Sequence, residues 1–250
     1  MTHISDSLLI NSFVVLSVAI GGMAAFAPQT AAIKYGFGVK AGTASSLFLQ
    51  GSGYITLCSA VVLYLCSTGN VSLHTALGCG MLSRIFWLVK SIATGAFAEA
   101  GIKTDRIGLV TTVVSACTYV LLSGNGDVDV AARAIVALVG VSAALLFLNP
   151  VLASRAVFSK EFSKPGNDDT TVTKVVFRAF GKTNLVNISL MAAMTMGSST
   201  AKALGCCNAI WALAELHDIV TRQYLDLGKG ISTCIVSFSI AAITSSILLA

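Results

Sequence analysis

The sequence predicts an all-α, polytopic membrane protein, a helical bundle of about eight transmembrane helices. Of its 250 residues, 55% are hydrophobic and only 11% are charged, whereas a soluble domain usually carries about 25% charged residues. The mean hydropathy is +0.84, and apolar runs recur along the whole chain, several of them approaching the roughly 18–20 residues that cross a bilayer. The charges are too few to cover the surface of a water-soluble domain, so most of that surface must face lipid.

Eight apolar stretches are candidate spans. They must be helices, because lipid offers no hydrogen-bonding partner to the backbone of an open strand. The predicted spans cover residues 8–27, 45–66, 74–94, 107–123, 131–149, 181–199, 202–220 and 231–250, and the short fourth span can begin a few residues earlier. Pro28 and Pro150 each follow an apolar run and are expected to end it.

Two polar connections punctuate this pattern. Gly124-Asn125-Gly126-Asp127 predicts a turn between the fourth and fifth spans. The longest polar segment, about residues 155–178, is expected to be an exposed loop that joins the halves of the protein. It is too short and too polar to form a domain.

The distribution of Lys and Arg predicts the orientation in the membrane. The loops after the odd-numbered spans hold eleven of these residues, and the opposite side holds two, Arg133 and Lys202. Basic residues favour the cytosolic side, so both termini are expected on the non-cytosolic side. The same scattered arrangement argues against nucleic acid as a partner, because the basic residues do not gather on one polar segment.

The chain also carries the signal of an internal repeat. Ala76-Leu77-Gly78-Cys79 recurs as Ala203-Leu204-Gly205-Cys206, and the ungapped alignment reaches Leu121-Leu122 and Leu248-Leu249. One residue of slack then pairs the upstream glycines Gly53 with Gly181 and Gly69 with Gly197. The alternative is that two alanine-rich membrane helices resemble each other by composition alone. We expect two four-helix repeats, residues 1–124 and 125–250, that are parallel and related by an axis along the membrane normal.

Short motifs in each half carry a family resemblance. In the second half these are a first helix that ends near Pro150, Phe177-Arg178-Ala179-Phe180-Gly181 before the next, and Ala214-Glu215-Leu216-His217-Asp218 in the third. This pattern resembles small four-helix membrane proteins, among them the ergosterol-biosynthesis scaffold protein of the endoplasmic reticulum and uncharacterised bacterial families. The resemblance implies scaffolding in an endomembrane.

A second resemblance concerns the N-terminal region. Ala24-Ala25-Phe26-Ala27-Pro28, after an apolar run, is similar to the cleavage motif of plastid-targeted proteins in algae with complex red plastids. It implies a plastid membrane as the alternative location. A signal peptide normally begins with a basic region, and residues 1–11 contain neither Lys nor Arg.

A few charged residues fall within the predicted spans. Trp211, Glu215, Asp218 and Arg222 are spaced so that they line one helix face, and Asp218 can pair with Arg222. A charge at the bilayer centre costs about 2.5–3.5 kcal/mol unless it faces protein or water, whereas a Lys near a helix end can extend to the interface. The candidate intramembrane polar site therefore comprises Arg84, Lys90, Glu215, His217, Asp218 and Arg222, with Lys90 as the one that can reach the inner interface.

Within this site, Arg84 is expected to pair with Glu215 first and Asp218 second, because the third helices of the two repeats are expected to face each other at the axis. The structural interpretation is an ion pair that joins the halves, and the functional one is a polar cavity for an anion, a proton or a lipid headgroup. A metal site is disfavoured, because Glu215 and His217 lie two residues apart and point about 200° apart on a helix. No cofactor is predicted.

Three classes of function remain open. The chain contains no nucleotide-binding glycine loop in a strand-turn-helix setting, no H-E-x-x-H motif and no nucleophile elbow. The preferred prediction is a non-catalytic integral membrane subunit or scaffold that holds other membrane proteins through its helix faces. The first alternative is a small-solute, proton or lipid transporter with a polar site between the repeats. The second is a lipid-modifying enzyme that uses Glu215, His217 and Asp218.

Overall fold

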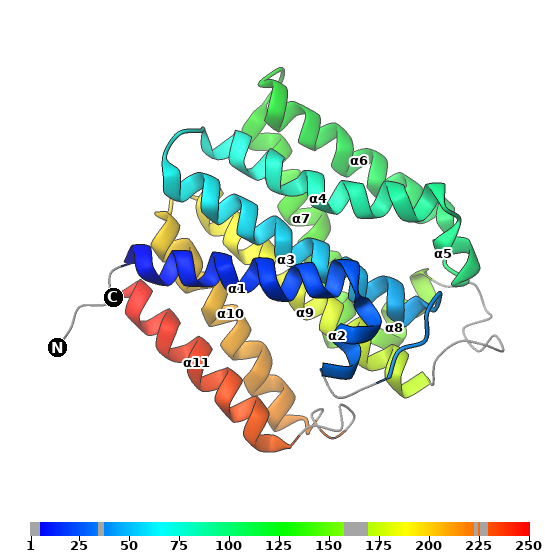
Figure 1. Ribbon diagram of the computed structural model, residues 1–250. Helices are drawn as coiled ribbons and strands as arrows, with labels where there is room; N and C mark the ends of the chain where they lie inside the picture. Colours follow the sequence, from blue (N-terminus) through cyan, green and yellow to red (C-terminus); the bar gives the residue numbers. More distant parts are fainter. Residues whose placement is uncertain (1–5, 35–37, 158–169, 223–224, 226–229) are drawn as a thin grey trace.

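The computed structural model describes residues 6–34, 38–157, 170–222, 225 and 230–250, and these residues form a helical bundle without strands (Figure 1). Eight helices are long: α1 (Asp6–Phe26), α3 (Ala44–Thr68), α4 (Leu73–Ala93), α6 (Thr104–Ser123), α7 (Val128–Leu148), α9 (Thr170–Thr195), α10 (Thr200–Val220) and α11 (Ile231–Leu249). Three are short: α2 (Pro28–Lys34), α5 (Ala96–Glu99) and α8 (Pro150–Val157). The predicted all-α fold is confirmed.

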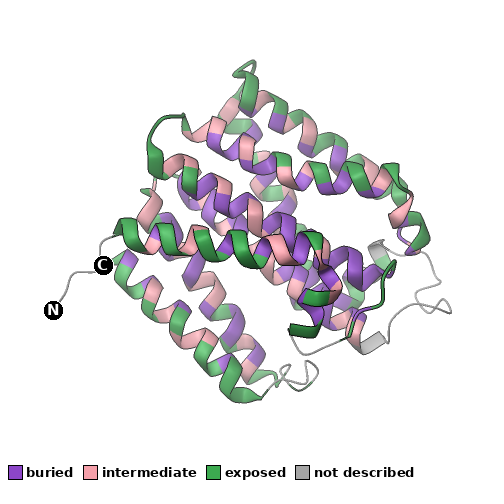
Figure 2. Cartoon of the chain, in the orientation of Figure 1, coloured by how far each residue is buried: buried purple, intermediate pink, exposed green. Residues whose placement is uncertain are grey.

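Seven of the described helices, all of the long ones except α9, are long and apolar enough to cross a membrane. Their outward faces are exposed and their buried faces meet inside the bundle (Figure 2). The outward faces carry large apolar side chains, such as Val141, which is 73% exposed, and Ile243, which is 60% exposed. Apolar surface on this scale needs lipid as its solvent, so the chain is an integral, multi-pass membrane protein.

The predicted spans agree with seven of the long helices to within three residues at each end. The sixth prediction, 181–199, is wrong at its start, because α9 begins at Thr170. The predicted loop at about 155–178 is therefore wrong at both ends, because residues 155–157 belong to α8 and residues 170–178 to α9. The remaining residues of that prediction, 158–169, fall outside the described part of the chain. Helix α9 contacts α3, α7 and α10, so its Lys, Arg and Asn side chains face protein. A helix that faces protein and not lipid can carry such polar side chains.

The two prolines end α1 and α7 as predicted, but each also begins a short helix. Pro28 is the first residue of α2 and Pro150 is the first residue of α8. Proline suits this position because the first amide of a helix has no partner within the helix. The predicted turn at 124–127 is confirmed: Gly124 ends α6 in a left-handed conformation, and the Asp127 side chain accepts from the amide of Val130 at the start of α7.

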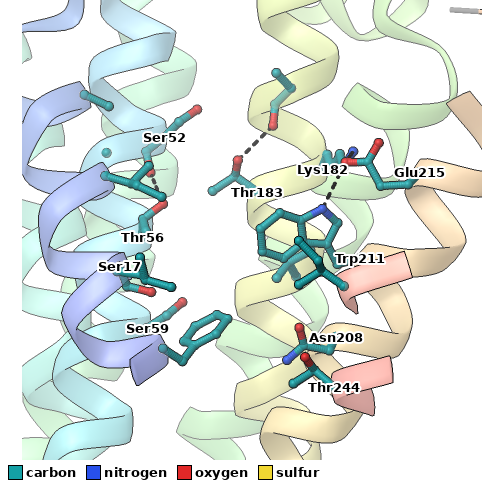
Figure 3. Close-up of a pocket in the computed structure, with 18 of the residues that line it drawn as sticks. Ser17, Ser52, Thr56, Ser59, Lys182, Thr183, Asn208, Trp211, Glu215 and Thr244 are labelled. Carbon is teal, nitrogen blue, oxygen red and sulfur yellow. Dashed lines mark hydrogen bonds and ion pairs between the residues drawn. The ribbon is translucent and has the colours of Figure 1, made fainter. Parts of the chain in front are cut away.

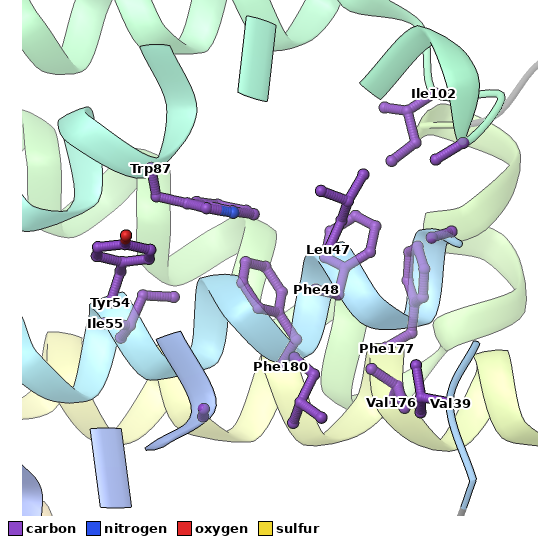
Figure 4. Packing of buried hydrophobic residues seen from close by; sticks show 14 of the residues in the cluster. Val39, Leu47, Phe48, Tyr54, Ile55, Trp87, Ile102, Val176, Phe177 and Phe180 are labelled. Atoms are coloured by element: carbon purple, nitrogen blue, oxygen red, sulfur yellow. The ribbon is translucent and has the colours of Figure 1, made fainter. Parts of the chain in front are cut away.

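Helices α3 and α9 form the centre of the bundle. The Ser45 hydroxyl donates to Thr173 at 3.2 Å, and the Asn187 amide donates to Ser59 at 2.8 Å, both contacts joining residues 128 apart. A constant separation means that the two helices run parallel and in register. At one end of this pair, the Phe48 ring of α3 packs at a tilt on Phe177 and edge-to-face on Phe180 of α9, with ring centroids 4.2 and 4.9 Å apart. Trp87 of α4 completes the cluster (Figure 4).

The helix contacts of the two halves correspond. α1 packs on α3, α3 on α4 and α4 on α6, just as α7 packs on α9, α9 on α10 and α10 on α11. The glycines correspond as well: a Cβ on Gly78 would lie 2.8 Å from Leu122, and one on Gly205 would lie 2.9 Å from Leu249. These contacts are the ones that the predicted duplication requires. The duplication itself stays a prediction.

One pair of contacts breaks this correspondence. Helix α6 of the first half packs against α7 of the second, but no comparable contact joins α1 to α11 within the described residues. The space between α1 and α11 is where the structure places its candidate site.

Candidate functional site

A cavity of about 500 Å³ lies between the two halves. α1 and α3 form one wall, and α9, α10 and α11 form the other (Figure 3). Apolar side chains such as Phe13, Leu16 and Ile240 make up much of the lining, and Lys182 and Glu215 bring charge to it. A largely apolar pocket with a few placed polar groups is the usual form of a small-molecule site.

Four charged side chains, two from α9 and two from α10, meet beside this cavity. Arg178 Nη2 lies 2.9 Å from Asp218 Oδ1, and Lys182 Nζ lies 2.6 Å from Glu215 Oε1 and 3.5 Å from Asp218 Oδ2. Arg178 and Lys182 are four residues apart and Glu215 and Asp218 are three apart, so each pair occupies one face of its helix. The cluster of Arg178, Lys182, Glu215 and Asp218 is neutral in sum, which lowers the cost of burying its charges inside the bundle.

Glu215 is the member of this cluster that also forms a hydrogen bond with α11. Its Oε1 atom accepts from Trp211 Nε1 at 3.0 Å, from Ser237 Oγ at 2.8 Å and from Lys182. The carboxylate is buried, with 8% of the residue exposed. Trp211 and Glu215 both line the cavity (Figure 3). These two residues of the predicted helix face therefore lie at the space between the two halves.

His217 points in a different direction from Glu215. Its Nδ1 atom lies 2.7 Å from Arg178 Nη2, and because a guanidinium can only donate, the ring nitrogen is the acceptor in this contact. The imidazole also lies 5.2 Å from the Phe147 ring, over which the Arg178 guanidinium sits at 4.9 Å. Within the described residues, Glu215 and His217 thus have separate partners, Lys182 for the carboxylate and Arg178 for the imidazole.

The predicted pair between Arg84 and Glu215 is wrong. Arg84 Nη2 donates to Asn184 Oδ1 of α9, while both acids of α10 pair with α9. The prediction placed α4 and α10 face to face at the axis, but α3 and α9 occupy that position. Arg84 is buried, and its Nη1 atom has no hydrogen-bonding partner within the described residues.

Lys90 and Arg222 also lie away from the cluster. Lys90 is exposed in the last turn of α4, as expected for a lysine that extends to the interface. Arg222 is exposed just beyond α10 and has a left-handed backbone, with φ at 56°. Asp218 pairs with Arg178 and Lys182 in place of the predicted Arg222.

Of the six predicted site residues, the structure thus brings together Glu215, His217 and Asp218 and separates the rest. Sequence reasoning missed Arg178, which was assigned to a loop, and Lys182, which was assigned to a span edge. Their spacing of four residues, together with the two acids in the next helix, was the signal that could have found them.

The function must be argued from this geometry. In comparisons with known proteins, no family model, no curated protein and no solved structure matches the chain. The two resemblances described above therefore stay predictions.

Proposed function

We propose that this protein is a carrier for a small amphiphile, which enters from the bilayer and binds in the cavity between α1 and α11. The single observation that supports this most is the cavity itself, which is about 500 Å³ in volume and has an apolar lining with Lys182 and Glu215 beside it. Ligand pockets typically enclose about 300–1,000 Å³, so the space suits one small amphiphile.

The position of the charged cluster also supports binding. Ionisable residues within a membrane are costly and are by default candidates for functional sites. A pair that only joins two helices could be closed off from any cavity, but Lys182 and Glu215 both line this one. An amphiphile would place its polar head at these side chains and its tail against the apolar walls of α1 and α11.

Tryptophan quenching tests the proposal, because the chain has two tryptophans in different environments. Trp211 lines the cavity, whereas Trp87 is 2% exposed within the aromatic cluster. Trp87→Phe and Trp211→Phe give two single-tryptophan proteins. With brominated dodecyl maltoside added to protein in unbrominated dodecyl maltoside, we expect saturable quenching of Trp211 and little quenching of Trp87.

A filling substitution separates the cavity from the surrounding detergent. Thr244→Phe would project a ring from α11 into the cavity, and Ile243→Phe places the same ring on a residue that is 60% exposed outside it. We expect Thr244→Phe to remove most of the Trp211 quenching and Ile243→Phe to leave it. Equal quenching of both tryptophans, or no effect of Thr244→Phe in a folded protein, would refute the carrier proposal.

The non-catalytic subunit or scaffold predicted from the sequence is the competing function. It requires partners bound to outward helix faces and assigns no role to the cavity. Other membrane proteins that co-purify in fixed ratio from mild detergent, and whose binding Ile243→Phe but not Thr244→Phe disrupts, would favour the scaffold.

For the orientation, the proposal is that both termini lie on the non-cytosolic side. Helix α1 begins and α11 ends at the same end of the bundle (Figure 1), and the Lys/Arg distribution supports the side. In sealed vesicles with the cytosolic face outward, tags at either terminus should resist added protease, while a tag inserted at Gly101, between α5 and α6, should be cleaved. Cleavage of a terminal tag in intact vesicles would reverse the assignment.

A further inference from the structure

We infer that the head group bound in this cavity is a hydrogen-bond donor, a hydroxyl or an ammonium, and not a carboxylate or a phosphate. The inference rests on the proposed carrier function and specifies the class of its ligand. It comes from the hydrogen bonds that the cavity-lining side chains already make.

The nitrogen donors that line the cavity are engaged by the protein. Lys182 Nζ binds both Glu215 and Asp218. Trp211 Nε1 donates to Glu215 Oε1, and Asn208 Nδ2 donates to the carbonyl of Leu204 at 2.9 Å. An ammonium carries three N–H groups and a primary amide two, so one N–H of Lys182 and one of Asn208 remain. An anionic head would reach the Lys182 N–H only beside the Glu215 carboxylate that this lysine already pairs with.

Two oxygen acceptors, by contrast, remain for a ligand. All the bonds that Glu215 makes within the described residues go to Oε1, which leaves Oε2. Asn208 Oδ1 is the second, and its assignment is secure because only the amide NH₂ can donate to the Leu204 carbonyl. Glu215 and Asn208 are seven residues apart on α10, two turns along the same face, and both line the cavity.

The hydroxyls of the cavity add to the same bias. Ser52, Thr56 and Thr183 each donate to the carbonyl four residues earlier in their own helix. Their hydroxyl oxygens can therefore only accept a hydrogen bond from a ligand. Ser17 and Thr244 also line the cavity, but a hydroxyl can donate or accept, so these two favour neither class.

Charge points in the same direction. The cluster of Arg178, Lys182, Glu215 and Asp218 is balanced, with two cations and two anions. Either a carboxylate or an ammonium head would add one unbalanced charge where screening is weak, and a hydroxyl would add none. The charge balance therefore favours a hydroxyl, and an ammonium offsets its added charge only through contact with Glu215 Oε2.

Three probes with the same tail and different heads test this inference: dodecanol, dodecylamine and dodecanoate. Each is titrated at neutral pH into the full-length Trp87→Phe protein whose Trp211 is quenched by brominated dodecyl maltoside, and recovery of fluorescence reports displacement. We expect dodecanol and dodecylamine to act at concentrations at least about tenfold below that of dodecanoate, since one lost hydrogen bond to a charged or buried group corresponds to about this factor.

Two variants identify the acceptors. Glu215→Gln should raise the displacing concentration of dodecylamine more than that of dodecanol, and Asn208→Leu, which leaves the charged cluster intact, should raise both. Ser142→Leu, on the exposed face of α7, is the polar-to-leucine control and should change nothing. Displacement by dodecanoate at equal or lower concentration than the other probes would overturn the inference while leaving the carrier function standing. Failure of all three probes in the folded protein would overturn the carrier function instead.

Discussion

Replacing Asp218 with leucine is expected to lower the free energy of unfolding by about 3–5 kcal/mol, the cost of stranding one partner of a buried ion pair. Asp218 is 5% exposed and receives Arg178 through both Nε, at 3.1 Å, and Nη2, at 2.9 Å. Its loss would leave the buried Arg178 guanidinium without its carboxylate. Unfolding of the purified protein in mixed detergent, followed by circular dichroism, measures the change.

The double variant Arg178→Leu/Asp218→Leu should recover most of this loss, because removing both charges leaves no stranded ion. The control is the exposed pair of His74 and Asp129, 3.0 Å apart, with the Asp129 side chain 66% exposed. Asp129→Leu should cost only about 0–1 kcal/mol, as is typical of surface pairs. If Asp218→Leu were as mild as Asp129→Leu, or if the two cluster substitutions were simply additive, the buried pair would not exist as described.

Adding one methyl group at either central glycine is expected to destabilise the protein by about 3 kcal/mol or more. A Cβ on Gly53 would lie 2.2 Å from the amide nitrogen of Ala25, and one on Gly181 would lie 2.6 Å from that of Phe147. Overpacking usually costs about 1–3 kcal/mol, and here the obstacle is the backbone of a neighbouring helix, which no rotamer change can relieve. Gly53→Ala and Gly181→Ala should lower the unfolding free energy by similar amounts.

Gly22→Ala is the matched control for both substitutions. Gly22 lies in α1 and a Cβ there would meet nothing within 4 Å, so the change should be neutral or slightly stabilising. The two sensitive glycines occupy equivalent positions in the proposed repeat, each against the end of the first helix of its half. A protein that tolerates Gly181→Ala but not Gly53→Ala would argue against that equivalence.

The sequence predicted the seven apolar helices well, the central α3 included, and it predicted α9 poorly. The reason is that hydropathy detects a helix only where its side chains are apolar. A helix that faces lipid must carry apolar side chains, so the apolar run in the sequence begins and ends where the helix does. Helix α11, which begins at Ile231, is an example. Helix α9 is surrounded by protein and can carry Arg178, Lys182 and Asn184. Hydropathy therefore shortened α9 and assigned its charged first half to a loop.

The same misplacement explains what was right and wrong about the site. Trp211 and Glu215 were correctly assigned to one face of α10, because helix periodicity alone decides this. Their partners depend on which helices occupy the axis, and that depends on contacts between α3 and α9, such as the bond from Asn187 to Ser59 and the packing of Phe48 on Phe177. Arg84 consequently donates a hydrogen bond to Asn184 and does not pair with Glu215. A single sequence carries no direct record of such long-range pairing.

The central claim is that the space between α1 and α11 holds an amphiphile, and an experimental structure of the protein in lipid nanodiscs tests it most directly. We predict elongated non-protein density in the cavity, with one end within hydrogen-bonding distance of Glu215 Oε2 or Asn208 Oδ1. The claim would be contradicted by a structure in which α1 packs directly against α11, as α6 packs against α7, and no such space remains.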